Sequence, residues 1–213
     1  MKIKTYILEC LGTFLMVFVG TGSIVSCNII SFKFPNIFIA LSFGLIIAFT
    51  IVLIGKQTGA HINPAVSIGF FFNKSLSFLD LICYIFFQFL GAIFASALLK
   101  VLFPNLTFLG NTIPQISFLS SFIYECLFTF LLMLVILLVV YIFDFSDSLS
   151  GLLIGSVVSV AALVIGPFTG ASLNPARSFG PMLMTDVYSG LWIYFIGPCL
   201  GSIVAVLLFR KLK

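Results

Sequence analysis

Long apolar runs, separated by short polar breaks, dominate this chain of 213 residues. Six of the runs reach the length of about 17–25 residues that a helix needs to cross a bilayer. Charged residues, prolines and glycines mark the breaks between them. We therefore predict six membrane-spanning helices, at about residues 5–28, 37–54, 78–102, 116–142, 149–166 and 188–209.

Two further apolar segments, at about 63–72 and 174–183, are too short to cross a membrane. Ten residues at about 1.5 Å each cover only half of a hydrocarbon core that is about 30 Å thick. Each segment begins with Asn-Pro, and proline suits the first helical turn because no N–H is needed there. We expect two half-helices that enter the membrane without crossing it.

The two short segments belong to near-copies of one motif, GAHINPAVSIG at 59–69 and GASLNPARSFG at 170–180. Three spans belong to each copy, so the second copy enters the membrane from the opposite side and the repeat is inverted. Short, proline-interrupted segments at matching places in two inverted halves point to a permeation path. We expect one channel domain over 1–213, with repeats at about 1–103 and 115–213.

Composition supports an integral membrane protein. Hydrophobic residues make up 62% of the chain and charged residues 8%, against roughly 25% charged in a soluble domain. The ten Lys and Arg residues are scattered, so no nucleic-acid partner is expected. The five cysteines lie within or beside apolar runs without metal-ligand spacing, and neither a metal nor a cofactor is expected.

Basic residues decide the expected orientation, because cytoplasmic loops carry an excess of Lys and Arg. With both termini cytoplasmic, only Lys33 and Lys100 lie outside, and seven other cations lie inside. We expect a multi-pass protein of the cell membrane, surrounded by lipid, with cytoplasmic termini. Two glycine pairs, at 151 and 155 and at 197 and 201, are typical of close helix packing within or between subunits.

Asn63 and Asn174 start the two half-helices and predict the chemistry of the path. Each helix N-terminus carries a partial charge of about +0.5, and an asparagine there can cap the helix and aim its NH₂ group into the lumen. Such a site would hold the oxygen of a neutral molecule and repel cations. Asn-Pro is also a common turn signal, but two copies at matching places among apolar runs disfavour that interpretation.

The paired Asn-Pro-Ala motifs, the trailing Arg177 and two Glu-x-x-x-Thr-Phe segments together resemble the aquaporin (major intrinsic protein) family over essentially the whole chain. The resemblance implies an all-α membrane bundle of six tilted helices plus two re-entrant half-helices, passive flux of water, and a homotetramer with one pore per subunit. It places the family's pore motif on Asn63, Pro64, Ala65, Asn174, Pro175 and Ala176.

The resemblance also places the family's narrow selectivity filter on Phe43, Ala162, Ala171 and Arg177. The two alanines depart from the family's usual pattern, because water channels usually have His at the first of these positions. Glycerol channels usually have Gly there and an aromatic residue at the second. Ser178 and the Tyr194-Phe195 pair resemble the water branch. We expect a water channel that can also admit small neutral solutes; the alternative is an aquaglyceroporin-like facilitator of glycerol, urea or dissolved gases.

Glu9, Glu125 and His61 are the remaining candidate site residues. Ionisable groups within the membrane are functional candidates by default. The resemblance implies that the two glutamates hold the half-helix loops through backbone N–H groups, and a proton relay is the alternative. For His61, a packed ring beside a pore-lining carbonyl competes with a gate that works by protonation.

Two other classes of protein share some of these features. A secondary transporter also uses inverted repeats and broken helices, but it normally has a central carboxylate or an unwound ion site. An intramembrane enzyme would need a catalytic set, and neither H-E-x-x-H nor G-x-S-x-G occurs. We therefore predict a channel rather than an enzyme.

Overall fold

The computed structural model describes residues 2–212, which form eight α-helices and no strand. Helices α3 (Pro64–Phe72) and α7 (Pro175–Thr185) are short, with nine and eleven residues. The remaining helices are long and apolar enough to cross a membrane, which confirms the prediction of six spans. They are α1 (Lys2–Ile30), α2 (Pro35–Thr58), α4 (Phe78–Leu102), α5 (Phe118–Tyr141), α6 (Asp147–Thr169) and α8 (Leu191–Leu212).

Helices α2 and α6 extend a few residues beyond the ends of their apolar runs, as far as a glycine that can end each helix. Their C-caps are Gly59 and Gly170, with left-handed φ angles of 82° and 85°. The N–H of each glycine bonds to a carbonyl four residues earlier, at Gly55 and Gly166. Glycine adopts this conformation without a steric penalty, so each helix continues to the glycine that can turn the chain.

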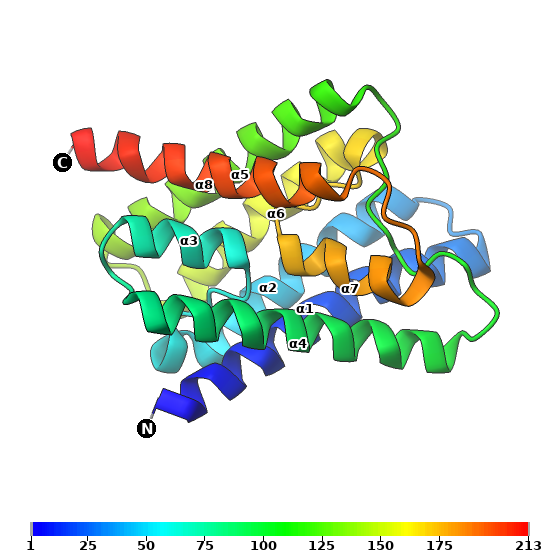
Figure 1. Ribbon diagram of the computed structural model, residues 1–213, viewed down its shortest axis with the longest axis horizontal. Coiled ribbons are helices and arrows are strands. Elements are labelled where there is room, and N and C mark those ends of the chain that lie inside the picture. Colours follow the sequence, from blue (N-terminus) through cyan, green and yellow to red (C-terminus); the bar gives the residue numbers. More distant parts are fainter. Residues whose placement is uncertain (1, 213) are drawn as a thin grey trace.

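The first turn of α1 and the last turn of α8 lie at the same end of the bundle (Figure 1), which we call the terminal end. Helix α3 lies in the half nearer this end, and α7 lies in the opposite half. Their N-terminal ends face each other inside the bundle. This is the arrangement that an inverted repeat of three spans and one half-helix predicts.

Glycines bring the long helices into close contact. A Cβ atom at Gly44 of α2 would collide with the carbonyl oxygen of Gly155 of α6, and a Cβ at Gly155 would collide with that of Gly44. Gly151 packs against Ala48 of α2, and Gly201 against Cys126 of α5. Small residues let helix backbones approach in lipid, where no hydrophobic force joins them. These glycines therefore serve contacts within the chain.

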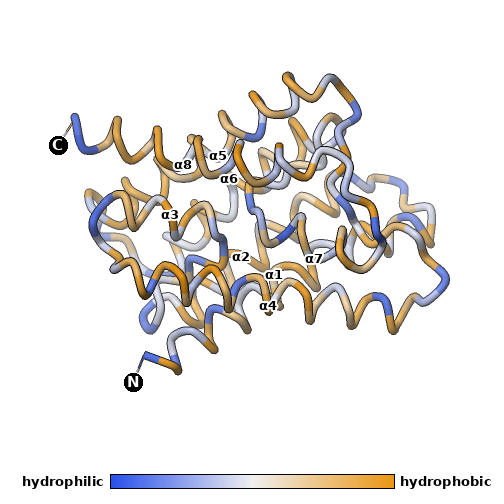
Figure 2. The backbone as a smooth tube through the Cα atoms, in the orientation of Figure 1, coloured by the Kyte–Doolittle hydropathy of each residue, from blue (hydrophilic) through white to orange (hydrophobic). Residues whose placement is uncertain are grey.

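The outer surface of the bundle is apolar. Figure 2 shows hydrophobic colouring along the helices and hydrophilic colouring concentrated at the two ends. Large side chains such as Leu45, Phe86 and Leu152 are more than half exposed. Helices satisfy their own backbone hydrogen bonds, so this surface suits hydrocarbon. The chain is a multi-pass membrane protein.

Candidate transmembrane pore

The two short helices begin at the motif asparagines. Asn63 caps α3, since its Oδ1 accepts a hydrogen bond of 2.8 Å from the N–H of Ala65. Asn174 caps α7 in the same way, with a bond of 3.0 Å from the N–H of Ala176. A proline occupies the first turn of each helix. Two partly positive helix N-termini therefore meet inside the bundle.

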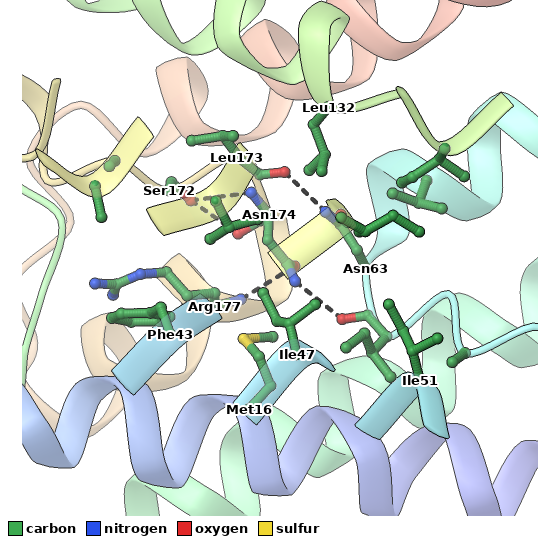
Figure 3. Close-up of a pocket in the computed structure, with 18 of the residues that line it drawn as sticks. Met16, Phe43, Ile47, Ile51, Asn63, Leu132, Ser172, Leu173, Asn174 and Arg177 are labelled. Atoms are coloured by element: carbon green, nitrogen blue, oxygen red, sulfur yellow. Dashed lines mark hydrogen bonds between the residues drawn. The ribbon is translucent and has the colours of Figure 1, made fainter. Parts of the chain in front are cut away.

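Each asparagine also reaches across to the opposite motif. Asn63 Nδ2 donates to the carbonyl of Leu173 at 2.8 Å, and Asn174 Nδ2 donates to the carbonyl of Ile62 at 2.9 Å (Figure 3). The sequence predicts that both NH₂ groups point into the lumen, but one N–H of each is used to join the loops. An amide nitrogen carries two hydrogens, so each asparagine keeps a second donor.

The loops that lead into α3 and α7 have an unusual backbone. Ala60 and Ile62 have φ angles of 46° and 44°, and Ala171 and Leu173 have φ angles of 44° and 54°. Side chains other than glycine are uncommon in this left-handed region, and a β-branched one such as Ile62 is a genuine outlier. Each such residue costs about 1–3 kcal/mol. Something in the surroundings must compensate.

In the first loop the compensation comes from Glu9 of α1, which is fully buried. Its carboxylate accepts the N–H of His61 at 2.9 Å and the N–H of Ile62 at 2.7 Å. The side-chain amide of Gln88 in α4 donates a third bond at 2.9 Å. Hydrogen bonds to a carboxylate are among the stronger ones in proteins. The geometry matches the loop-holding role that the resemblance implies.

In the second loop Glu125 of α5 occupies the corresponding place and is also fully buried. It accepts the N–H of Ser172 at 2.9 Å and the N–H of Leu173 at 2.8 Å. Its third bond, at 2.7 Å, comes from the hydroxyl of Thr169 at the end of α6. Successive N–H groups that converge on one anion form a backbone nest.

One cavity of about 610 Å³ contains all four candidate filter residues and both asparagines. Its lining includes Phe143 and Asp144, from the segment between α5 and α6, which lies at the terminal end in Figure 1. It also includes Asn36 of the first turn of α2 and Phe108 of the segment after α4, and both of these segments lie at the opposite end. The cavity therefore follows the long axis of the bundle and passes the meeting point of the two motifs. Much of its wall on α2 and α6 is aliphatic and includes Ile39, Ile47, Ile51, Ile154 and Val158.

Arg177 lies beside Phe43 in this cavity (Figure 3). Its guanidinium carbon is 5.0 Å from the centroid of the Phe43 ring, and its Nη1 donates to the carbonyl of Gly110 at 2.6 Å. The side chain is only 1% exposed, and its Nε has no hydrogen-bond partner within residues 2–212. Charges act strongly where water is largely excluded. The wall of the cavity thus carries a fixed positive group.

Sequence reasoning did not identify Gly110. It belongs to the segment 103–117, which connects α4 to α5 and returns into the bundle to reach Arg177. Its φ angle is 77°, and a Cβ atom there would come within 2.9 Å of Thr21. Apolar periodicity contains no signal for such a return, and only an isolated glycine between Leu109 and Asn111 marks the place.

The ring of His61 is packed rather than free. It stacks on Phe70 with 4.4 Å between ring centroids, and it lies 4.8 Å from the ring of Tyr84. Its Nδ1 is 3.1 Å from the hydroxyl of Ser67. The residue lines the cavity yet is only 8% exposed. These contacts fit the packed-ring alternative.

Comparisons with known proteins agree with this architecture. Residues 1–209 match the family description "Major intrinsic protein". Nodulin-26 of Glycine max is 34% identical over 99% of this chain and 78% of its own length. The glycerol uptake facilitator protein-like 6 of Lactiplantibacillus plantarum is 37% identical over 97% of both chains. A solved aquaglyceroporin from Plasmodium falciparum superposes with a TM-score of 0.91 at 27% identity, covering 99% of this chain and 96% of its own.

The chain belongs to the major intrinsic protein family, which is a family of membrane channels and not of enzymes. Its relatives include proteins named as aquaporins and a protein named as a glycerol uptake facilitator. The predictions of the family, of the fold and of channel function are therefore confirmed.

Proposed function

We propose that this protein conducts water and small uncharged solutes passively down their gradients, through the cavity that passes the meeting point of α3 and α7. The observation that carries the proposal is the cavity itself, which extends toward both ends of the bundle and passes Asn63, Asn174 and Arg177. Two helix N-termini and one buried guanidinium give this path a positive potential. That potential repels cations, while the asparagine and arginine donors bind the oxygen of a neutral molecule.

Water is the first solute that we propose, and glycerol or urea is the second. The candidate filter offers only methyl groups at Ala162 and Ala171, which line the same cavity as Phe43 and Arg177. Smaller side chains leave a wider opening, and a wider opening rejects larger polar solutes less strongly. The name of the Lactiplantibacillus relative, a glycerol uptake facilitator, supports glycerol as a candidate.

We further propose the cell membrane as the location, with a cytoplasmic terminal end and four copies of the chain in each assembly. Lys2, Lys4, Lys56 and Lys74 favour this orientation. Reporters fused to the C-terminus, one active only in the cytoplasm and one active only outside, test the orientation. The mass of the purified protein in detergent tests the tetramer.

Stopped-flow light scattering of proteoliposomes tests the function. We expect faster shrinkage than empty liposomes in an impermeant osmolyte, and faster re-swelling in glycerol or urea. Flux should rise linearly with the gradient and be independent of any ion gradient. Water permeability equal to that of empty liposomes would overturn the proposal.

A further inference from the structure

The inverted repeat gives every residue of the candidate filter a counterpart in the other half of the pore. A shift of 111 positions, which relates the two motifs, pairs Phe43 with Ile154 and Arg177 with Val66. It also pairs Ala162 with Ile51 and Ala171 with Ala60. We call the counterparts the apolar ring, which consists of Ile51, Ala60, Val66 and Ile154.

All four residues of the apolar ring line the same cavity as the filter. Val66 and Ile154 belong to one buried hydrophobic cluster, against which Ile51 packs. Figure 3 shows Ile51 on the far side of Asn174 from Phe43. The apolar ring therefore lies between the asparagine pair and the terminal end. A solute that crosses the membrane in either direction must pass both the filter and the apolar ring.

The apolar ring and the filter differ in chemistry. Arg177 gives the filter a charge and five N–H donors, of which one, at Nη1, bonds to the carbonyl of Gly110. No side chain of the apolar ring carries a hydrogen-bonding atom. The ring also has three branched side chains where the filter has two alanines, a phenylalanine and an arginine. Residues of both loops, 59–62 and 170–173, line the cavity, so the difference lies in the side chains of the two sets.

A polar solute loses hydrogen bonds to water in a narrow apolar passage, and each bond that is not replaced is unfavourable. Glycerol has three hydroxyl groups, and water is far smaller. The filter can replace one lost bond through Arg177, whereas the side chains of the apolar ring replace none. The dehydration penalty for a polyhydroxylated solute is therefore larger at the ring.

We propose that the apolar ring, rather than the arginine filter, limits the passage of polyhydroxylated solutes through this channel. The inference rests on the proposed function, since it requires a conducting pore. It assigns a selectivity role to Val66 and Ile51, whose counterparts in the other half are Arg177 and Ala162.

Val66→Thr tests the inference, because it adds a hydroxyl group with almost no change in shape. We expect the ratio of glycerol to water permeability to rise roughly three- to tenfold, as one replaced hydrogen bond implies. Ile51→Thr provides a second variant if Val66→Thr does not assemble. The matched control is Val52→Thr, the same substitution at the neighbouring position of α2, where the side chain is 48% exposed on the outer surface. This control should keep the ratio of the unmutated protein.

Ala162→Ser adds a hydroxyl group at the filter instead, and its ratio should rise less than that of Val66→Thr. A ratio unchanged in both ring variants, or a larger rise in Ala162→Ser, would overturn the role of the ring. Both results require that the unmutated protein conducts water, so they leave the proposed function intact. An unmutated protein without water flux would overturn the proposed function instead.

Discussion

The two loops that carry the Asn-Pro-Ala motifs share one scaffold and differ in the side chains that they present to the cavity. In each loop, two successive N–H groups bind a buried glutamate, Glu9 in one half and Glu125 in the other. In each half a tyrosine hydroxyl, from Tyr84 or Tyr194, donates a 2.7 Å bond to the carbonyl of the last helical residue before the loop. The backbone is therefore held alike on both sides.

The differences lie in the side chains. His61 corresponds to Ser172 and Val66 to Arg177. In α4 and α8, where Gly91 corresponds to Gly201 at a shift of 110 positions, Gln88 corresponds to Pro198. The repeat thus separates two tasks, because bonds to the backbone keep the strained loops in place while the positions that line the cavity remain free to vary. Selectivity can change in one half without disturbing the scaffold of either.

The largest effect should follow from Glu9→Gln or Glu125→Gln. Glutamine replaces one acceptor oxygen by an NH₂ group, which would face a loop N–H and leave buried donors unpaired. Each unpaired donor costs about 1–3 kcal/mol, a large share of the roughly 5–15 kcal/mol that stabilises a folded protein. We expect the yield of monodisperse protein in size-exclusion chromatography to fall strongly and equally for both variants. The exposed Asp186 offers a control, Asp186→Asn, which should keep its yield.

Unequal losses would show that the two loops are not held alike. A well-folded glutamine variant whose flux responds to a pH gradient differently from the unmutated protein would favour the proton-relay alternative.

Arg177→Val makes the second half resemble the first, because Val66 is the counterpart of Arg177. The variant removes the fixed charge that stands 5.0 Å from Phe43. Two unit charges 5 Å apart interact by about 3 kcal/mol at an effective dielectric constant of about 20. We therefore expect the proton or Na⁺ leak of proteoliposomes to rise roughly tenfold or more, measured with an internal dye. An unchanged leak in correctly assembled protein would mean that the helix N-termini alone exclude cations.

Gln88→Leu and Thr169→Val each remove one of the three bonds to a loop-holding glutamate. Hydrogen bonds to charged groups contribute about 1.5–3 kcal/mol. We expect each variant to lower the melting temperature in detergent by a similar amount, with less damage than the glutamine variants. A loss confined to one variant would show that Glu9 and Glu125 depend unequally on their third hydrogen bond.

Hydropathy and length alone predicted the order of the helices, because lipid imposes apolar spans of fixed length. The motif repeat predicted which asparagines meet, since an inverted pair must bring its half-helices together. The sequence did not predict the length of α2 and α6, because apolar periodicity fades before Gly59 and Gly170 end them.

The supporting contacts were harder to predict. The sequence does not show which neighbouring helix a glutamine within an apolar helix faces. The bond from Gln88 to Glu9 is therefore visible only once α1 and α4 are packed. The return of Gly110 to Arg177 depends on a segment without periodicity. The apolar ring was missed for a different reason, since isoleucine and valine in a membrane chain look like lipid-facing bulk until the fold places them in the cavity.

The smallest effect concerns His61, which occupies the place of Ser172 in the other half. If the imidazole of His61 only packs against its neighbours, its protonation has no part in conduction. Its Nδ1 faces the neutral hydroxyl of Ser67, and Glu9 already binds the backbone N–H of His61. An unperturbed histidine changes charge between about pH 5 and 8. We expect water permeability to vary by less than about twofold over that range, in both the unmutated protein and His61→Phe, which keeps the stack on Phe70. A strong decline at low pH that disappears in His61→Phe would instead make His61 a gate, and the two loops would then differ in regulation as well as selectivity.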